Sequence, residues 1–333
     1  MNLADLRARL DAVDRTSLAS RPTPLLRMPR LQAALGPEIP ELWVKLDEQT
    51  GFGLGGNKVR KLDRELAPSR LQGVTHLVTT GGPQSNHCRV TAAAAARLGL
   101  GCVLVINGAA PDPPTGNALL HRTFGARIHQ VADRAAREPA LQQVSAEIEA
   151  AGGRALVLPL GASTALGAIG FVEALVELHD QMGAAPDRSI HLFVSSSSGG
   201  TLAGLWAGLA LLDRPDIDIT AVSADTPAPQ LRATAERLAA GALERLQFDA
   251  AQLAAVAHRI DVRDDQIGTG YGQPTEASEE AAELLATSEG VLVEPFYTAK
   301  AAAGMITAVR DGQFPAGDRV IFWHTGGHPA LFR

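Results

Sequence analysis

Short apolar segments rich in valine, leucine and isoleucine recur along the chain and alternate with longer segments of helical periodicity. Glycine, proline or polar residues bound each short segment, as is typical of buried β-strands. The pattern predicts strands at 41–46, 75–80, 102–106, 127–131, 155–158, 191–194, 217–223, 291–293 and 319–323. It predicts helices at 3–14, 58–67, 87–99, 117–124, 138–151, 166–182, 202–212, 229–256, 276–288 and 299–310.

Regular alternation of strands and helices is typical of parallel sheets that helices cover on both faces. Residues 21–25, with two prolines, are expected to be extended, because each proline disfavours a helical conformation in the residue before it. Glycine-rich and polar segments repeatedly follow the predicted strands, and ligands of open α/β sheets bind at that position. The sequence therefore predicts an α/β fold with a ligand site at the carboxyl ends of its strands.

Composition and charge narrow the class of protein. The chain of 333 residues is 46% hydrophobic and 20% charged and has a net charge of −6. Its length suits two domains or one large α/β unit with an insertion. The acidic balance and the lack of a basic stripe argue against binding to nucleic acid. No apolar run reaches the roughly 18 residues of a membrane span. Because the N-terminal segment is typical of a charged helix and not of a signal peptide, we expect a cytoplasmic protein.

Cysteine and histidine usage gives no sign of a metal site. Cys88 and Cys102 form no CxxC pair and are expected to be reduced, buried thiols. The nine histidines include no HExxH motif and lack the spacing of metal ligands. We therefore predict no bound metal.

The segment 51–66 joins a glycine-rich turn to a helical pattern and carries Lys58 at the junction. A lysine in this position can hold a phosphate or form a Schiff base with an aldehyde. Gly51, Gly53 and Gly56 match GxGxxG, but no acidic residue follows about 20 positions on, as a dinucleotide site requires. A P-loop would have serine or threonine after the lysine, where this chain has Val59. Neither nucleotide motif is therefore supported.

A second glycine-containing turn follows the predicted strand 191–194 and precedes the helix 202–212. Its backbone amides can converge on a phosphate dianion, which the positive end of the helix dipole also favours. The alternative is a serine-rich turn with an ordinary helix cap. A phosphate site far along the chain from a reactive lysine suits pyridoxal phosphate. The residues concerned are Ser197, Ser198, Gly199, Gly200 and Thr201.

The turn after strand 75–80 offers a further anion site. Ser85, Asn86 and His87 open a predicted helix, where amides and a hydroxyl can bind a substrate carboxylate. Ser85 could equally be an N-cap without further function. Tyr271 and Tyr297, the only tyrosines, lie in predicted loops, where a phenol can transfer protons or simply pack.

Together these segments resemble the pyridoxal-phosphate enzymes of the tryptophan-synthase-β-like fold, and among them the D-cysteine desulfhydrase and 1-aminocyclopropane-1-carboxylate deaminase family. The resemblance covers nearly the whole chain: RPTPL (21–25), GGNKVRKL (55–62), TTGGPQSNH (79–87), GASTALGAIGFVEA (161–174), SSSSGGTLAGL (195–205), TGYGQP (269–274), EPFYTAKA (294–301) and HTGGHPALF (324–332). It implies two open, mostly parallel twisted sheets flanked by helices (fold type II). It also implies a large cofactor-binding domain of residues 1–57 and 169–333, a smaller inserted domain of residues 58–168, and a homodimer.

The resemblance also assigns roles to residues. It implies that Lys58 carries the cofactor as a Schiff base, that Asn86 bonds the ring hydroxyl oxygen, and that Ser85, Asn86 and His87 bind the substrate carboxylate. The loop 197–201 is expected to hold the phosphate, although a serine stands at 197 where the family usually has glycine. Two further positions match the active-site tyrosines of the family, namely Tyr271 and Tyr297.

Two threonines separate the activities within this family. The deaminases carry a segment similar to YEGK, whose glutamate faces the pyridine nitrogen, and a leucine before the last Gly-Gly. This chain has Thr298 in place of the glutamate and Thr325 in place of the leucine. As neutral hydrogen-bond partners of the cofactor, they support a largely neutral pyridine, which is sufficient for β-elimination of a good leaving group. Taken alone, either threonine could also be a helix cap.

The leading hypothesis is a β-eliminating lyase that acts on a small amino acid and converts D-cysteine to pyruvate, ammonia and hydrogen sulfide. Three alternatives remain open from the sequence. They are a 1-aminocyclopropane-1-carboxylate deaminase, a sulfo-lyase acting on L-cysteate, and a cofactor-binding protein without turnover.

Overall fold

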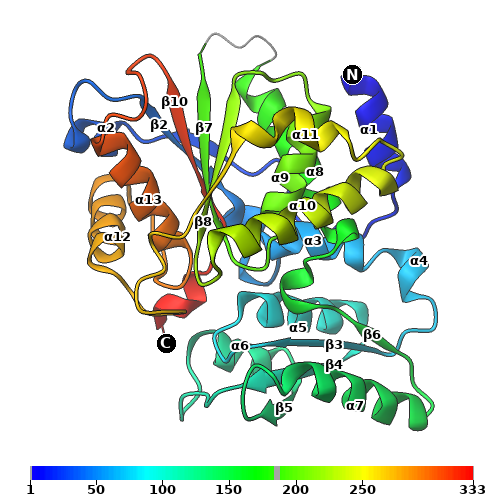
Figure 1. Ribbon diagram of the computed structural model, residues 1–333. Coiled ribbons are helices and arrows are strands. Elements are labelled where there is room, and N and C mark those ends of the chain that lie inside the picture. The colour runs from blue at the N-terminus through cyan, green and yellow to red at the C-terminus, as the bar shows by residue number, and fades with distance from the viewer. Residues whose placement is uncertain (1, 184–187, 333) are drawn as a thin grey trace.

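Two sheets organise the chain (Figure 1). The computed structural model describes residues 2–183 and 188–332. The six-stranded sheet has the order β1-β2-β10-β7-β8-β9, with β1 Leu25–Arg27, β2 Glu41–Leu46, β7 Ile190–Ser196, β8 Ile217–Ser223, β9 Ile260–Arg263 and β10 Arg319–His324. The four-stranded sheet has the order β5-β4-β3-β6, with β3 His76–Gly81, β4 Gly101–Asn107, β5 Arg127–Val131 and β6 Ala155–Val157. Every neighbouring pair is parallel except β1 with β2, so the predicted fold class is confirmed.

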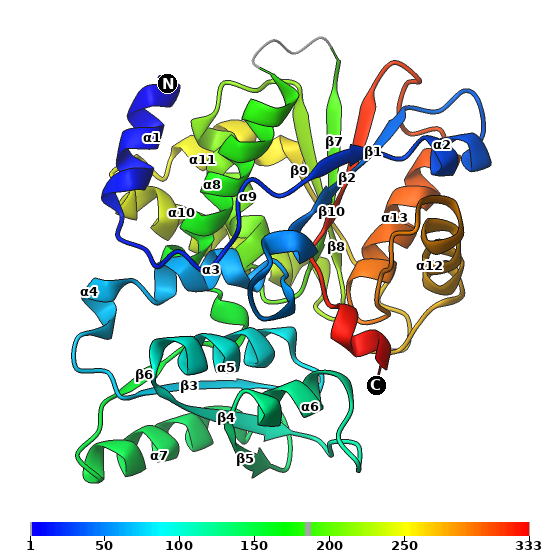
Figure 2. The same cartoon turned by 180° about the vertical axis from the view of Figure 1, so that it is seen from behind.

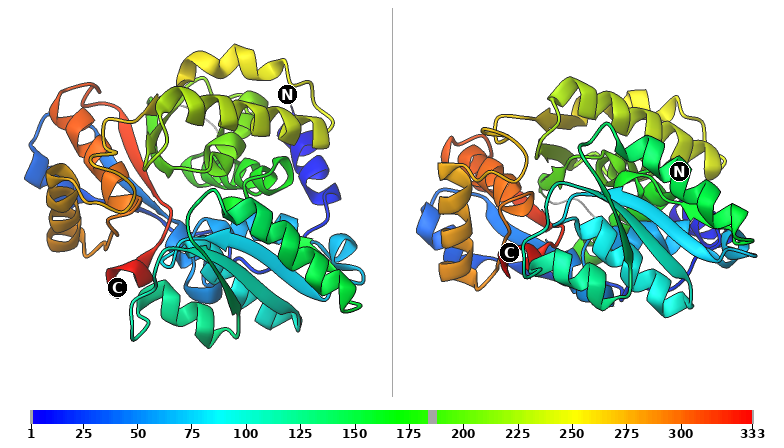
Figure 3. Two further views of the ribbon diagram at one scale, coloured as in Figure 1. Left: turned by 60° about the horizontal axis from the view of Figure 1, so that its bottom comes forward. Right: turned by 90° about the horizontal axis from the view of Figure 1, so that it is seen from below.

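Helices cover both faces of each sheet (Figures 1 and 2). On the large sheet, α8, α9 and α10 cover one face, and α12 and α13 cover the other. On the small sheet, α5 and α7 lie on opposite faces (Figure 3). The helices are α1 Leu3–Ala12, α2 Pro29–Leu35, α3 Lys58–Glu65, α4 Pro68–Leu71, α5 Asn86–Leu98, α6 Gly116–Thr123, α7 Arg137–Ala150, α8 Ala165–Met182, α9 Gly200–Leu211, α10 Ala228–Arg245, α11 Gln252–Val256, α12 Glu276–Glu289 and α13 Thr298–Arg310.

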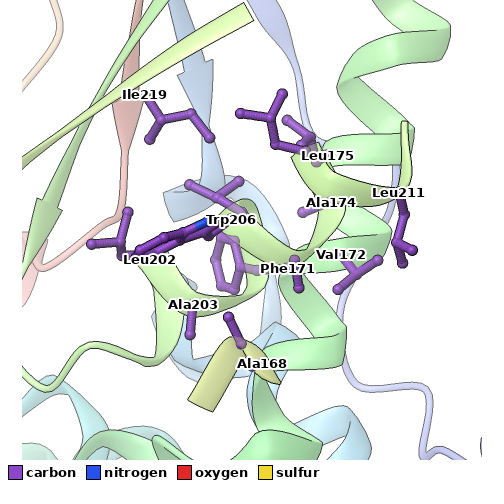
Figure 4. Packing of buried hydrophobic residues seen from close by; sticks show 14 of the residues in the cluster. Ala168, Phe171, Val172, Ala174, Leu175, Leu202, Ala203, Trp206, Leu211 and Ile219 are labelled. Carbon is purple, nitrogen blue, oxygen red and sulfur yellow. The ribbon is translucent and has the colours of Figure 1, made fainter. Parts of the chain in front are cut away.

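The largest apolar core lies between the large sheet and helices α8 to α10 (Figure 4). Trp206 of α9 is fully buried there, and Phe171 of α8 packs on Trp323 with ring centroids 6.0 Å apart. The two helices approach closely at Gly204, where an added Cβ would lie 2.1 Å from the carbonyl oxygen of Ala168. This core holds α9 in place, and the N-terminus of α9 faces the cleft described below.

Some predicted elements differ from the structure. The strand predicted at 291–293 is wrong, because this segment pairs with no strand; instead, ring Nε2 atoms of His324 and His328 lie 2.7 and 3.0 Å from the Leu292 carbonyl oxygen. Residues 229–256, predicted to be mostly helical, form two helices, α10 and α11, with a break at 246–251. Strands β1 and β9 and helices α2 and α4 were not predicted. The proposed domain boundaries, after residues 57 and 168, stay a prediction.

Helix α3 is buried although most of its residues are charged. The Arg60 guanidinium donates hydrogen bonds to Asp47, at 2.8 to 3.1 Å, and to Glu177, at 3.0 Å. Lys45 bonds the same Glu177 carboxylate. Burial raises the pKa of Glu177, but the hydrogen bonds and charges of Arg60 and Lys45 outweigh it and lower the pKa to about 2. This network ties α3 to the large sheet and to α8.

The buried network makes a prediction about stability. Asp47→Asn removes a charge that faces Arg60, and both side chains are fully buried. Lys45 and Arg60 would then share Glu177 alone, which leaves one excess positive charge in the buried network, so we expect the free energy of unfolding to fall by about 3 kcal/mol, measured as a lower urea midpoint. In the control, Glu280→Gln removes an exposed pair with Arg310, and no measurable shift is expected. Equal shifts of the urea midpoint in the two variants would contradict the proposed contribution of the buried network to stability.

Candidate active site

A cleft with about 840 Å³ of empty space, which includes its mouth open to solvent, lies where strands of both sheets end. Its walls include Gly81 at the end of β3, Ser196 at the end of β7, and residues just beyond β5, β8 and β10. This is where parallel sheets bind ligands. Eleven of the residues predicted for the site line the cleft: Lys58, Ser85, Asn86, His87, Ser197, Ser198, Gly199, Thr201, Tyr271, Tyr297 and Thr325. Gly200 and Thr298 are not among the lining residues.

The glycine turn delivers Lys58 to the floor of the cleft. Gly55 has a φ of +66°, and an added Cβ would lie 1.7 Å from the carbonyl oxygen of Glu48, so only glycine fits. The Lys58 amine donates to Asn57 Oδ1 at 3.1 Å, and Asn57 Nδ2 donates to Thr201 Oγ1 at 3.0 Å. Asn57, which the sequence reading passed over, thus links the lysine to the predicted phosphate loop.

Burial makes the amine of Lys58 easier to deprotonate. It lowers the pKa of Lys58 to about 8, because an ammonium ion is poorly solvated inside the protein. The negative charge of Glu294 opposes this shift, and the positive charge of Arg89 adds to it. A lysine with such a pKa presents a substantial fraction of free amine at mildly alkaline pH and can act as nucleophile or base.

The loop before α9 forms a cradle for an anion. Gly199 has a φ of +80° and precedes the N-terminus of α9. Ser163 braces the loop: its Oγ lies 2.8 Å from Ser198 Oγ and accepts from the amide of Gly200 at 3.2 Å. An added Cβ at Gly200 would lie 2.9 Å from Ser163 Cα, and one at Gly161 would lie 2.5 Å from Ser198 Oγ. Side chains would fill this cradle, so its glycines fit a bound phosphate group.

The start of α5 forms the opposite wall. Ser85 is the N-cap of α5, since its Oγ accepts from the amide of Cys88 at 3.2 Å, and it also lines the cleft. Asn86 is held by Asn117, whose Nδ2 donates to Asn86 Oδ1 at 2.8 Å. Burial lowers the pKa of His87 well below its usual value, so its ring is neutral. This helix start can bind a carboxylate.

The two tyrosines, which are far apart in the sequence, meet at the cleft. Tyr271 Oη and Tyr297 Oη lie 2.5 Å apart. Burial raises the pKa of Tyr271 to about 12 and that of Tyr297 well above its usual value. Both phenols are therefore neutral, and one of them can donate a proton.

The two threonines have different surroundings. Thr325 Oγ1 lies 2.7 Å from Ser195 Oγ, and both residues line the cleft. Thr298 is fully buried at the start of α13, and its Oγ1 bonds the backbone and the carboxylate of Glu294. Contact between Thr298 and a cofactor stays a prediction.

The sequence reading missed Glu294. Its carboxylate accepts from the amides of Phe296, Tyr297 and Thr298 at 2.8, 3.1 and 2.9 Å and so caps α13. Burial raises its pKa to about 7 even though these amides favour the ionised form. Glu294 fixes the turn that carries Tyr297. An acidic residue a few positions before a helix was the available signal.

The reading also missed three charged residues that line the cleft: Arg134, Arg137 and Asp225. Asp225 follows β8 and accepts from Ser197 Oγ at 2.7 Å, while the two arginines follow β5. Each lies just beyond a strand end, and this position was the available signal. Within the part of the chain that the structure describes, no three histidine, cysteine, aspartate or glutamate side chains gather as a metal site would require. Likewise, no helix in that part is long and apolar enough to cross a membrane.

Together, a partly buried lysine amine at the cleft, an anion cradle at the start of α9 and an open α/β fold are typical of the class of pyridoxal-phosphate-dependent enzymes. Comparison with known proteins agrees, since the family model "Pyridoxal-phosphate dependent enzyme" matches residues 16–326. The chain belongs to this family. The predictions of an enzyme and of its cofactor are thereby confirmed.

Comparison with individual proteins shows which members of this family the chain resembles. The chain is 40% identical over 324 residues to D-cysteine desulfhydrases of Salmonella schwarzengrund (strain CVM19633) and Salmonella choleraesuis (strain SC-B67), covering 96% of this chain and 95% of each relative. A solved structure of an ACC deaminase homologue matches with a TM-score of 0.88 and 29% identity, covering 100% of this chain and 97% of the other. The predicted resemblance to the desulfhydrase and deaminase family is therefore confirmed.

The pKa of Lys58 predicts how fast the cofactor-free protein captures pyridoxal phosphate. Only the unprotonated amine attacks the aldehyde, so the capture rate should rise with pH and level off above about 8, the lowered pKa of Lys58. Stopped-flow absorbance of Schiff-base formation measures this profile, with Nα-acetyl-lysine as the control. A midpoint near 10.5, as for the free amino acid, would contradict the proposed surroundings of Lys58.

Proposed function

We propose that this enzyme catalyses β-elimination of D-cysteine to pyruvate, ammonia and hydrogen sulfide. The observation that carries the proposal is that one cleft collects the Lys58 amine, the anion cradle before α9 and the start of α5. The similarity to D-cysteine desulfhydrases over nearly the whole chain supports the choice of substrate.

Different residues of the cleft are proposed to bind the cofactor, to bind the substrate and to transfer protons. Bound pyridoxal phosphate supplies an electrophilic aldehyde and an electron-withdrawing ring that makes the Cα proton of the substrate more acidic. The amides of the loop 197–201 would hold the phosphate, and Asn86 would hydrogen-bond the ring hydroxyl oxygen. Ser85 and the first amides of α5 bind the substrate carboxylate.

Proton transfer falls to Lys58 and the tyrosine pair. Lys58 accepts the Cα proton; a relay of Ser85 and Tyr297 is the weaker candidate base, because burial raises the pKa of Tyr297 well above its usual value and keeps its hydroxyl protonated. The electron pair of the C–S bond leaves with the sulfur, to which a neutral tyrosine hydroxyl donates. Water then hydrolyses the released enamine to pyruvate and ammonia.

The Thr325–Ser195 hydroxyl pair favours this reaction over ring opening of 1-aminocyclopropane-1-carboxylate. Placed against the pyridine nitrogen, this pair would make the ring a weaker electron sink, because a hydroxyl cannot stabilise a protonated pyridine as a carboxylate does. Elimination of a thiolate needs only this weaker sink, whereas a cyclopropane carbon is a poor leaving group. The deaminase is therefore the second candidate.

The proposal includes a homodimer in the cytoplasm. Exposed apolar side chains of Leu54, Leu119 and Phe332 line one hollow, as is typical of an interface between subunits. Sedimentation of the holoenzyme tests the dimer. Both cysteines are free and buried, which suits a reducing compartment.

A panel of four substrates tests the reaction: D-cysteine, L-cysteine, L-cysteate and 1-aminocyclopropane-1-carboxylate. We expect pyruvate and sulfide from D-cysteine as the fastest reaction, and Lys58→Ala should slow it at least about a thousandfold. Pyruvate, 2-oxobutyrate, sulfide and sulfite are assayed, and circular dichroism checks that the variant is folded. Full activity of Lys58→Ala, or 2-oxobutyrate as the main product, would contradict the assignment.

A further inference from the structure

Arg137 carries a positive charge into the cleft without a carboxylate to balance it. It is the first residue of α7 and lines the cleft with its side chain partly exposed. Its guanidinium donates two hydrogen bonds to Asn107 Oδ1, one of them from Nε at 2.8 Å. Asn107, at the end of β4, is neutral. Across residues 2–183 and 188–332, no carboxylate forms an ion pair with Arg137.

The neighbouring arginine is balanced. Arg134 pairs with Asp225 at 3.4 Å, and its guanidinium lies 5.2 Å from the ring centroid of Tyr271. Its side chain is 57% exposed, so water also solvates the charge. Arg134 is therefore a matched reference: it is a guanidinium of the same cleft, three residues away, with its own counter-ion.

The surroundings of Arg137 favour an incoming anion. Burial lowers the pKa of Arg137, and repulsion by Arg134 lowers it further. The groups that oppose this shift are the thiol of Cys88 and the hydroxyls of Tyr271 and Tyr297. All three have raised pKa values and are neutral near pH 7, so they provide no counter-charge. A planar guanidinium in this state binds oxyanions well, because it offers parallel N–H donors.

The other anion sites of the cleft already have assigned ligands. The loop 197–201 holds the phosphate, and the start of α5 takes the substrate α-carboxylate. Arg137 lies on the substrate side, since it interacts electrostatically with Cys88, in the first turn of α5, and with Tyr271 and Tyr297. The phosphate and the α-carboxylate therefore leave the guanidinium of Arg137 without an assigned anion. We assign to it a third negative group, which belongs to the side chain of the substrate.

We propose that Arg137 forms a subsite for an anionic β-substituent, so that the enzyme binds amino acids with a charged β-group and eliminates one that can leave, such as a sulfonate. This inference rests on the proposed β-elimination. With cysteate, the base takes the Cα proton and the C–S electron pair leaves with the sulfur as sulfite. Water hydrolyses the enamine to pyruvate and ammonia, and no oxidant or reductant is needed.

Binding of unreactive amino acids tests the charge alone. Aspartate and asparagine have nearly the same shape but differ by one negative charge, and neither has a β leaving group. Each, as D- and L-enantiomers, is titrated into the holoenzyme and followed by the absorbance of the cofactor. For the better-bound enantiomer we expect aspartate to bind about ten times more tightly than asparagine, because one charge-assisted pair contributes roughly this factor.

Variants of Arg137 and Arg134 show which side chain causes the preference for aspartate. Arg137→Gln, which can still donate to Asn107, should abolish the preference for aspartate, and Arg137→Lys should restore part of it. Arg134→Gln, the matched loss of charge, should keep it. An equal preference for aspartate in the wild type and in Arg137→Gln would overturn the proposal, as would its loss in Arg134→Gln alone.

Steady-state kinetics distinguish two roles of Arg137: binding the β-substituent and binding the α-carboxylate, which every substrate carries. In Arg137→Gln, kcat/KM for the reactive enantiomer of cysteate should fall about tenfold or more, while kcat/KM for β-chloroalanine, whose substituent is uncharged, should change less than about threefold. Equal losses for both would assign Arg137 to the α-carboxylate and overturn the proposal.

The two proposals fail separately. If D-cysteine is inert but the preference for aspartate depends on Arg137, the proposed function fails and the subsite stands. If D-cysteine is turned over and the wild type shows no preference for aspartate, the subsite fails and the proposed function stands.

Discussion

Burial of a highly charged helix is the constraint on which the active site depends. Helix α3 begins at Lys58, and seven of its eight residues are buried. Such charges are tolerated only when partners neutralise them. Arg60 meets Asp47 and Glu177, while Asp63 pairs with Arg21 at 2.7 Å. These pairs fix the position and rotation of α3 and thereby fix where the amine of Lys58 emerges.

The rest of the cleft follows from the ends of parallel strands. The segments after β3, β7 and β10 carry the start of α5, the anion cradle and Thr325 to one place. Burial then sets the protonation states: it frees the amine of Lys58 and keeps the two tyrosines neutral. One cleft thus brings together a candidate base, candidate proton donors and candidate anion sites, as the proposed β-elimination requires.

Local signals made much of this arrangement predictable. Alternating apolar and helical segments predicted all of the parallel sheet strands except β9, and glycine turns before helices pointed to Lys58 and the loop 197–201. The segment 291–293 has the composition of a strand but finds no pairing partner, which only the tertiary structure can show. Arg137 and Glu294 depend on burial and on neighbours distant in sequence, so their surroundings could not be read from their own segments. The counter-charge of Arg134 is likewise a tertiary feature.

The most direct test of the account is to find which lysine carries the cofactor. Lys58 and Lys61 are both in α3, but Lys61 is fully buried and its amine donates to Ser163 Oγ at 3.1 Å. Borohydride reduction of the holoenzyme, followed by proteolysis and mass spectrometry, fixes the label in place. The account predicts a pyridoxyl group on Lys58. A label on Lys61, or none in a protein that binds the cofactor, would contradict it.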